Sequence, residues 1–394
     1  MLTAGEARRL VEQARSELVD LAKALVKVPT PNPPGQEEQA ALILKAKFEA
    51  EGLKPELIQE SEDRANIVVR LPGAGKAPAL LYDGHLDTVG PGDESEWTDP
   101  PYSGSIKNGR LLGRGASDMK GGVAAEAMAA ILAYRAGIEL AGDLIIASTC
   151  GEETDNLGAY TLRNSGWLNG VAGIVIAEPS SNELLIAEKG ALWVEITTFG
   201  RTSHGSAPHL GINAINKMLD LLADLRYFCP SSDKHPLLGE GTASLNVLNG
   251  GFKTNVVPDR CTAIFDIRTV PGRTHEDIIT ALKTELELAQ TSDKDFRAEF
   301  KVVKDLPSVS THEDNGLVRL AQTTGRELWD REPELKGISG YTDAAVLCPG
   351  TNIPFIIFGP GDMATAHQPN EYVELEKVVD ATAYLLLLAA KWGN

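Results

Sequence analysis

Apolar strand patterns alternate with helical patterns along residues 1–187, and this alternation limits the fold more than any other feature of the chain. It is typical of an α/β layer in which most strands are parallel. Helical patterns cover residues 36–51 and 119–136, and the second is rich in alanine, a strong helix former. The strand patterns lie at residues 66–71, 79–83, 143–148 and 173–177.

A different pattern begins after Glu188. Strands with alternating polar and apolar side chains are predicted at residues 191–199, 243–248, 260–268 and 296–303, with helices at 212–227 and 274–289. The order strand, helix, strand, strand, helix, strand predicts a small two-layer α+β domain. The α/β pattern then resumes at residues 315–328, 354–358 and 375–391. We therefore predict an α/β domain of residues 1–187 and 304–394, interrupted by an inserted domain of residues 188–303.

The charge and the cysteines exclude several classes of protein. With 55 acidic and 37 basic side chains the net charge is −18, which argues against nucleic acid or an anionic membrane as partner. The chain has no apolar run of about 18 residues and no apolar core of the signal-peptide type. The cysteines are Cys150, Cys229, Cys261 and Cys348. They form no Cys-x-x-Cys pair, so neither a disulfide framework nor a thiolate metal site is expected. We expect a cytoplasmic protein.

Five acidic or imidazole side chains are candidates to hold two metal ions: His85, Asp118, Glu153, Glu178 and His367. His85 follows an apolar run and precedes Asp87 by two residues, so in an extended chain the two side chains share a face. A carboxylate in that position can hold the second ring nitrogen of a ligating imidazole. Asp87 is therefore expected to orient His85.

The other candidates also follow strand or turn patterns, where open α/β sheets place their sites. Asp118 lies in the glycine-rich segment 113–122 directly before a predicted helix, where a simple N-cap is the alternative interpretation. Glu152 and Glu153 follow a predicted buried strand, so one could bind metal while its neighbour faces a water molecule. A solvated loop is the alternative for this pair, as it is for His367.

These motifs together resemble the M20-type metallopeptidases and amidohydrolases. This family includes acetylornithine deacetylase, succinyl-diaminopimelate desuccinylase, glutamate-releasing carboxypeptidase and aminoacylase. The resemblance covers nearly the whole chain. It rests on six segments in order: His85-x-Asp87, Trp97 to Tyr102 leading into Gly-Arg-Gly-x-x-Asp118-x-Lys, Glu152-Glu153, Glu178-Pro179, Ser203-His204 and His367.

The resemblance implies that His85 and Glu178 bind one ion, Glu153 and His367 the other, and that Asp118 bridges the two. Imidazole and carboxylate ligands without thiolate suit Zn²⁺, with Co²⁺ or Mn²⁺ as alternatives. Two such ions would polarise the scissile carbonyl and acidify a water molecule. Glu152 would then act as the general base.

The resemblance extends to the inserted domain, which it implies is a lid and dimerisation domain. His204 would stabilise the charge that develops on the carbonyl oxygen, and in dimeric members this histidine reaches the partner's site. Arg268 resembles the arginine that grips a substrate carboxylate, and Asn255 resembles a neighbouring polar contact. Gly340 lies in a substrate loop, where Tyr341 departs from the usual Gly-Gly-Thr-Asp. The remaining histidines are assigned to surface or packing: His209, His235, His275 and His312.

We therefore expect a homodimeric, two-metal hydrolase that cleaves the amide bond of a small N-acylated amino acid. Glu178, where the dipeptidase branch carries aspartate, favours a deacylase. A dipeptidase or carboxypeptidase with the same metal site is the nearest alternative. A catalytically silent metal-binding or interaction protein is the alternative from another class.

Overall fold

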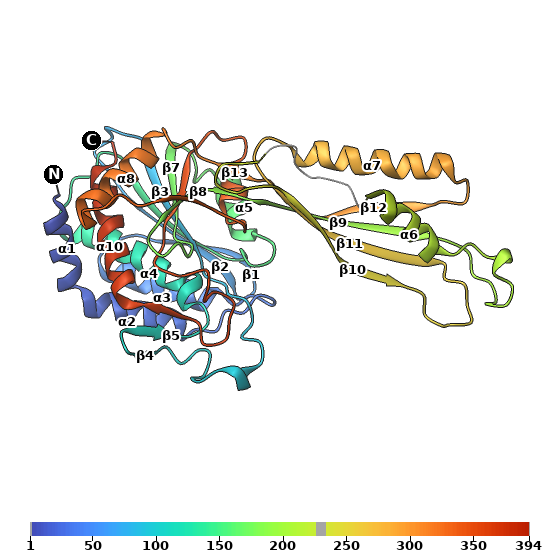
Figure 1. Cartoon of the computed structure of the whole chain (residues 1–394). Helices are drawn as coiled ribbons and strands as arrows, with labels where there is room; N and C mark the ends of the chain where they lie inside the picture. Colours follow the sequence, from blue (N-terminus) through green and yellow to red (C-terminus); the bar gives the residue numbers. More distant parts are fainter. Residues whose placement is uncertain (1, 226–233, 394) are drawn as a thin grey trace. The chain divides into compact units, whose positions relative to one another are not determined.

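The computed structural model describes residues 2–225 and 234–393 (Figure 1). The predicted helix end at Tyr227 and the thiol of Cys229 therefore lie outside the described residues. The chain divides into two compact units. The first runs up to Ile186 and includes Ser310–Lys336 and the chain from Thr342 on; the second comprises Ala187–Val309 and Gly337–Tyr341.

The first unit is built on a large mixed sheet, in which the strand order is β1-β2-β6-β3-β7-β15-β8-β13, with β14 paired to β8. Parallel pairing joins the four central strands β6, β3, β7 and β15, so the predicted α/β class is confirmed and its parallel part is the middle of the sheet. The strands are β1 (Glu56–Ser61), β2 (Arg64–Leu71), β3 (Ala79–His85), β6 (Leu144–Thr149), β7 (Val171–Ile176), β8 (Leu184–Glu188), β13 (Val309–Ser310), β14 (Leu335–Ile338) and β15 (Phe355–Ile357).

Helices pack on this sheet through apolar side chains. The long helices α4 and α10 contact each other, α4 also packs on β3 and β6, and α1 lies beside α10 (Figure 1). The short helices α5 and α9 form a separate pair. The helices of this unit are α1 (Ala4–Gln13), α2 (Arg15–Val26), α3 (Glu38–Ala50), α4 (Gly121–Arg135), α5 (Leu157–Asn164), α8 (Gly316–Trp329), α9 (Ala344–Leu347) and α10 (Leu375–Lys391).

Helix α4 is buried nearly all round, because its alanines and glycines let neighbouring elements approach closely. A small three-stranded sheet of β16 (Tyr372–Glu374), β5 (Arg110–Leu112) and β4 (Ser105–Lys107) lies beside its start, where β16 contacts the turn before the helix. In the part of the chain that the structure describes, no helix is long and apolar enough to cross a membrane.

The second unit is a two-layer α+β structure, as predicted. Its four antiparallel strands have the order β10-β11-β9-β12, and α6 and α7 pack on one face of the sheet. Leu192, Val194 and Ile267 point from the strands into that core. The elements are β9 (Gly190–Phe199), α6 (Ala214–Leu225), β10 (Thr242–Gly250), β11 (Arg260–Thr269), α7 (His275–Ser292) and β12 (Ala298–Leu306).

Strand β12 extends beyond its predicted end at Val303. Its register to β9 shifts between Val302 and Lys304, so the polar and apolar alternation is interrupted although the pairing continues to Leu306. The second compact unit includes the chain from Ala187 to Val309.

Candidate metal centre

Three parallel strands bring the predicted ligands to one edge of the large sheet. Strand β3 ends at His85, which pairs with Thr149 at the end of β6, and the loop after β6 carries Glu152 and Glu153. Strand β7 ends at Ile176, two residues before Glu178. Because the carboxyl ends of parallel strands meet at one edge, side chains far apart in the sequence converge there.

Asp118 reaches the same place from the turn that precedes α4. Its backbone is not helical (φ −122°, ψ 96°), and α4 has Lys120 at its N-cap position, so Asp118 does not cap the helix. The backbone N–H groups of Ser117 and Asp118 donate to Glu371 Oε1 at 2.9 and 3.1 Å. Glu371 also forms a buried ion pair with Arg114. The turn is thus held by a buried carboxylate.

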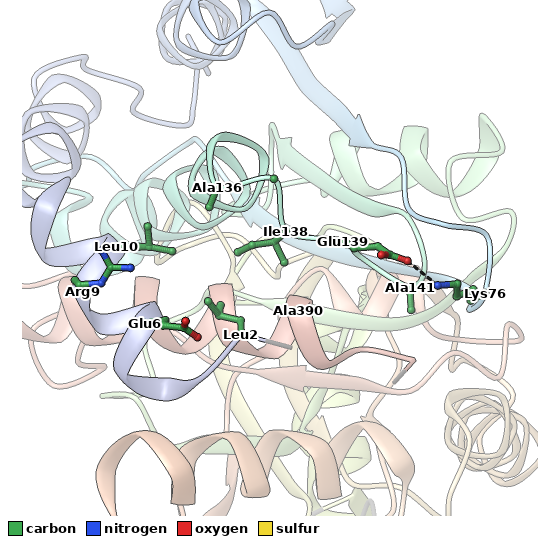
Figure 2. Close-up of a pocket in the computed structure, with 11 residues that line it drawn as sticks. Leu2, Glu6, Arg9, Leu10, Lys76, Ala136, Ile138, Glu139, Ala141 and Ala390 are labelled. Carbon is green, nitrogen blue, oxygen red and sulfur yellow. Dashed lines mark hydrogen bonds and ion pairs between the residues drawn. The ribbon is translucent and has the colours of Figure 1, made fainter.

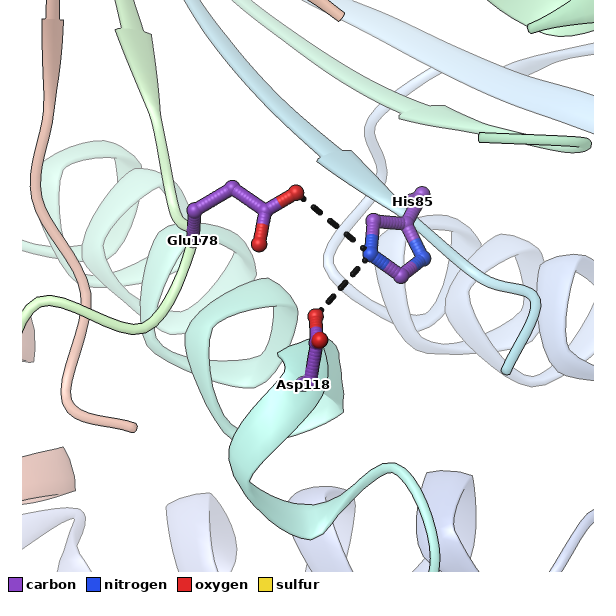
Figure 3. A group of neighbouring side chains, drawn as sticks. All are labelled: His85, Asp118 and Glu178. Carbon is purple, nitrogen blue, oxygen red and sulfur yellow. Dashed lines mark hydrogen bonds and ion pairs between the residues drawn. The ribbon is translucent and has the colours of Figure 1, made fainter. Parts of the chain in front are cut away.

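Two groups of side chains share Asp118. His85 Nε2 lies 3.2 Å from Asp118 Oδ1 and 3.5 Å from Glu178 Oε1. Figure 3 shows both carboxylates facing the His85 ring. His367 Nε2 lies 3.2 Å from Asp118 Oδ2 and 3.1 Å from Glu153 Oε1. In each group the possible ligand atoms lie within 4.8 Å of one another. The two oxygens of Asp118 therefore face two different histidines.

The carboxylates of this centre are short of compensating positive charge. Burial, followed by the neighbouring Asp118 carboxylate, raises the pKa of Glu178 well above its ordinary value. Burial also raises the pKa of Glu152 well above its ordinary value, and Glu153 adds to this effect. Divalent cations would remove this excess of negative charge, and the ligands are the imidazole and carboxylate groups that Zn²⁺ accepts. The residues present thus fit two metal ions.

The charges of His85 and His367 and the carboxylate of Asp118 stabilise one another, as the pKa shifts of these groups indicate. Burial alone would lower the pKa of His85, but the carboxylates of Asp118 and Asp87 raise it well above its ordinary value. Burial alone would raise the pKa of Asp118, yet the His367 and His85 rings hold it below its ordinary value. Positive charge beside Asp118 is therefore stabilised, whether it comes from protons or from metal ions.

Asp87 lies beside His85, but its carboxylate mainly holds another loop. His85 Nδ1 is 2.9 Å from the carbonyl oxygen of Asp87 and 3.5 Å from its Oδ1. An N–H at Nδ1 can donate to that carbonyl, which leaves Nε2 as the ligand atom. The carboxylate accepts bonds from the backbone N–H groups of Gly151, Glu152 and Glu153 at 3.0 to 3.1 Å.

The structure brings seven of the predicted site residues together and places the other four in the second unit. The seven are His85, Asp87, Asp118, Glu152, Glu153, Glu178 and His367. The four in the second unit are His204, Asn255, Arg268 and Gly340. Within that unit, Gly205 N donates to Asn255 O at 2.8 Å, which joins the segments of His204 and Asn255.

Arg268 lies at the opposite end of the β9–β11 pair from these two segments. It pairs with Ala191, whereas Arg260 pairs with Phe199 at the end that leads to His204. The guanidinium of Arg268 binds Asp266 through Nε at 2.8 Å and Nη2 at 3.1 Å, and it lies 5.9 Å from the centre of the Tyr341 ring.

Two important residues escaped sequence reasoning. Glu371 and Asn32 hold Asp118 and Asp87 respectively, and Asn32 Nδ2 donates to Asp87 Oδ2 at 2.8 Å. In the sequence both belong to polar loops that look solvated, so only the arrangement in space reveals them. Among the other histidines, His275 bonds Thr269 and Asp305 in the manner of a catalytic triad, but Thr269 is fully buried and the group is packing.

A cavity of about 570 Å³ lies elsewhere in the first unit (Figure 2). It is lined by α1, the turn after α4 and the end of α10, including Leu10, Ile138 and Ala390. Its walls contain none of the predicted site residues, so it plays no part in the metal centre.

Comparison with known proteins gives one consistent result. Residues 81–391 match the model of the peptidase family M20/M25/M40. A probable succinyl-diaminopimelate desuccinylase of Staphylococcus epidermidis is 32% identical over 91% of this chain and 94% of its own length. A Bacillus subtilis deformylase of N-formyl-4-amino-5-aminomethyl-2-methylpyrimidine is 29% identical over 98% of this chain and 96% of its own length. The structure of an M20 family metallo-carboxypeptidase from Sulfolobus solfataricus superposes with a TM-score of 0.79 at 19% identity. The superposition covers 96% of this chain and 99% of the other, so the two proteins share a fold.

Proposed function

We propose that this chain, which belongs to the peptidase family M20/M25/M40, removes the acyl group of a small N-acylated amino acid by hydrolysing its amide bond. That the chain is a metal-dependent hydrolase of amide bonds follows from its family. Removal of an acyl group from nitrogen is supported by two relatives, because the names of both describe it. An amino acid as the acylated group is supported by the first, whose name specifies succinyl-diaminopimelate.

The observation that carries the proposal is the position of Asp118 between two histidines, each accompanied by a glutamate. We propose that His85 and Glu178 hold one divalent ion, that Glu153 and His367 hold the other, and that Asp118 joins them. Zn²⁺ suits these ligands best, and Co²⁺ or Mn²⁺ could replace it. Such ions would polarise the amide carbonyl and acidify a water molecule.

In this proposal Glu152 moves the proton. Its side chain is buried, and its backbone N–H is fixed by Asp87 at 3.1 Å. Its carboxylate can take a proton from water and pass it to the departing amine. Asp87 contributes by fixing both the His85 ring and the loop of Glu152.

We propose that residues of the second unit bind the substrate. Arg268 would hold a carboxylate of the substrate in a bidentate manner, and its Nη1 donors lie outside the pair with Asp266. Asn255 and the backbone of Gly340 would add polar contacts. His204 would donate to the carbonyl oxygen as negative charge develops there.

A homodimer formed through the second unit is part of the proposal. Strand β10 is an edge strand, and all its residues are exposed, including Leu245, Val247 and Leu248 at 37 to 45%. An edge strand with unpaired backbone groups and exposed apolar side chains is a template for pairing with another chain. We propose that a second copy covers it.

The test is amine release from a panel of N-succinyl, N-acetyl and N-formyl amino acids and of dipeptides, with Zn²⁺- or Co²⁺-loaded protein. Hydrolysis of N-acyl amino acids is expected, with N-succinyl substrates among the best. Cleavage of dipeptides alone would replace the proposal with a dipeptidase.

The control for this assay is Glu152→Gln. This change should lower kcat by about 10²- to 10⁴-fold and leave the metal content unchanged, because Glu152 belongs to neither ligand group. Full activity of the variant would remove Glu152 from the role of base.

A further inference from the structure

The loop between β6 and α5 carries both Glu152 and Glu153, so its shape sets the position of a proposed base and of a proposed ligand. It is a tight turn, in which the N–H groups of residues 154, 155 and 156 all point to the carbonyl oxygen of Gly151 at 2.6 to 3.2 Å. Asp87 binds its middle through three backbone N–H groups. At its ends, Gly158 N donates to Cys150 O at 2.8 Å, and side chains add further support.

Asp343 touches both ends. Thr149, the last residue of β6, donates from Oγ1 to Asp343 Oδ2 at 2.8 Å. Asn156, directly before α5, donates from Nδ2 to Asp343 Oδ1 at 3.1 Å. We infer that Asp343 is a positioning residue that fixes the loop of Glu152 and Glu153 by joining its two ends, an inference that rests on the proposed function.

The conformation of Asn156 shows why this support matters. Its φ is 52°, in the left-handed region that costs most residues energy, although asparagine tolerates it better than most. Asn156 is 1% exposed and Asp343 is 2% exposed, so the bond between them is shielded from water. Without an acceptor, the buried amide of Asn156 would lose its partner, and a buried donor left unpaired destabilises the conformation that places it there. The end of the loop would then move.

A second explanation is that Asp343 acts by charge, since it is one of the carboxylates that raise the pKa of Glu152. Asp343→Asn separates the two explanations. An asparagine at 343 can still accept from Asn156 and can donate to the hydroxyl of Thr149, so it keeps the shape of the loop and removes the charge.

The experiment measures kcat, KM and stepwise Co²⁺ binding of Asp343→Ala, Asp343→Asn and Asn156→Gly in the full chain. Asp343→Ala should lower kcat about 100-fold with little change of KM, because small displacements of catalytic groups cost about that much. It should also weaken binding of one Co²⁺ equivalent about 10-fold, since only one of the two ligand groups includes Glu153. Asp343→Asn should restore most of both.

Asn156→Gly covers the case in which Asp343→Ala does not fold. Glycine adopts φ of 52° readily, so this variant removes the contact to Asp343 without adding backbone strain, and kcat should fall about 10-fold. Thr382→Val is the matched control, because its buried hydroxyl donates to Val378 O of its own helix, away from the loop of Glu152 and Glu153. It should change stability alone.

Two results would overturn the inference. The first is wild-type kcat and wild-type Co²⁺ binding in both Asp343→Ala and Asn156→Gly. The second is an equal loss of kcat and Co²⁺ binding in Asp343→Asn and Asp343→Ala, which would show that Asp343 acts through its charge. The proposed function fails in a different way. If the wild type binds two Co²⁺ but hydrolyses nothing in the panel, the substrate proposal is wrong, and the Co²⁺ titrations of the variants still decide the role of Asp343.

Discussion

His367 has the most exposed side chain of the candidate metal centre, at 47%, and two carboxylates surround its Nε2. The hydrogen bonds to Asp118 and Glu153 raise its pKa to about 10. A histidine must be neutral to bind a metal ion, so a metal at this position has to displace a proton. The same carboxylates that attract the metal also attract the competing proton.

Metal affinity should therefore increase with pH across the neutral range. Because the pKa of His367 lies near 10, its ring is protonated below that value, and each step down in pH favours the proton over the metal. Zn²⁺ titrations by calorimetry at several pH values, in buffers of different ionisation enthalpy, would count the protons released. His367→Ala should release about one proton fewer per chain. Affinity that does not vary with pH would contradict the prediction.

The neighbouring sequence predicts the place of some site residues in the structure and not of others. His85, Glu153 and Glu178 were predictable from residues alone as candidates, since each follows an apolar strand pattern, and the structure places them at one sheet edge. The place of His367 could be expected only from the resemblance, because a histidine in a polar loop carries no local signal. The burial of Glu371 was not predictable at all, since nothing near it in the sequence shows that Arg114 and the turn of Asp118 will surround it.

Charged side chains also join whole elements. Glu17 on α2 binds Arg135 at the end of α4 at 2.6 Å and forms an ion pair with Lys47 on α3. Arg135 in turn binds Glu51, which follows α3, at 2.7 Å. Three helices of the first unit are therefore connected through one partly buried network.

Glu17→Gln should lower the stability of the protein at neutral pH and have little effect at strongly acidic pH. The bonds to Arg135, opposed by burial and assisted by Lys47, lower the pKa of Glu17 from 4.5 to about 2. The carboxylate thus stabilises the fold above about pH 4.5, and this contribution is lost as the pH falls toward 2. Urea unfolding at pH 7 and pH 3 would measure the difference: the loss of stability should be smaller at pH 3 than at pH 7 but still present, because the folded-state pKa is about 2.

Glu12→Gln is the matched control for this experiment. Glu12 also pairs with an arginine, Arg15, but its side chain is 62% exposed, and exposed pairs contribute about 0 to 1 kcal/mol. An equal loss of stability in both variants would show that burial of the Glu17 network is unimportant.

Elements with an apolar period were predicted well, and elements without one were not. Helix α10 spans the predicted residues, and β9, β10 and β11 agree with prediction to within two residues at each end, because polar and apolar side chains alternate along each of these strands. The small sheet of β4, β5 and β16 was not predicted. Its strands have three residues each, which is too few for a period of two to be recognised.

At the scale of the whole chain, the second unit has its own core and its own sheet, and it is continuous except for the short segment Gly337–Tyr341. The pattern of the sequence predicted an inserted domain, because the alternation of strands and helices stops after Glu188 and later resumes. It could not predict that segment, since its five residues have no pattern and join the second unit only through tertiary contacts, such as Lys189 N to Ile338 O at 3.1 Å.

The position of His204 in the second unit argues for its action on a second chain. Strand β9 enters this unit near Ala187 and has ten residues, so its far end lies about 30 Å from its start. His204 follows that far end and is exposed, with Nδ1 bound to Ser206 Oγ at 2.8 Å. We propose that this histidine completes the site of a second chain, provided that the two chains associate through β10.

Mixing subunits tests this directly. His85→Ala removes a proposed ligand and His204→Ala removes the proposed donor, so each variant alone should be nearly inactive. In a hybrid dimer one site combines an intact metal centre with an intact His204. Random reassortment should then restore about a quarter of wild-type activity, because about half of the dimers are hybrids and each has one complete site of two. The control is wild type mixed with the double variant, whose hybrids have no complete site if His204 acts on its partner and one complete site if it acts within its own chain. Activity contributed by those control hybrids, with none recovered in the first mixture, would place His204 in its own subunit's reaction and remove the dimer from the mechanism.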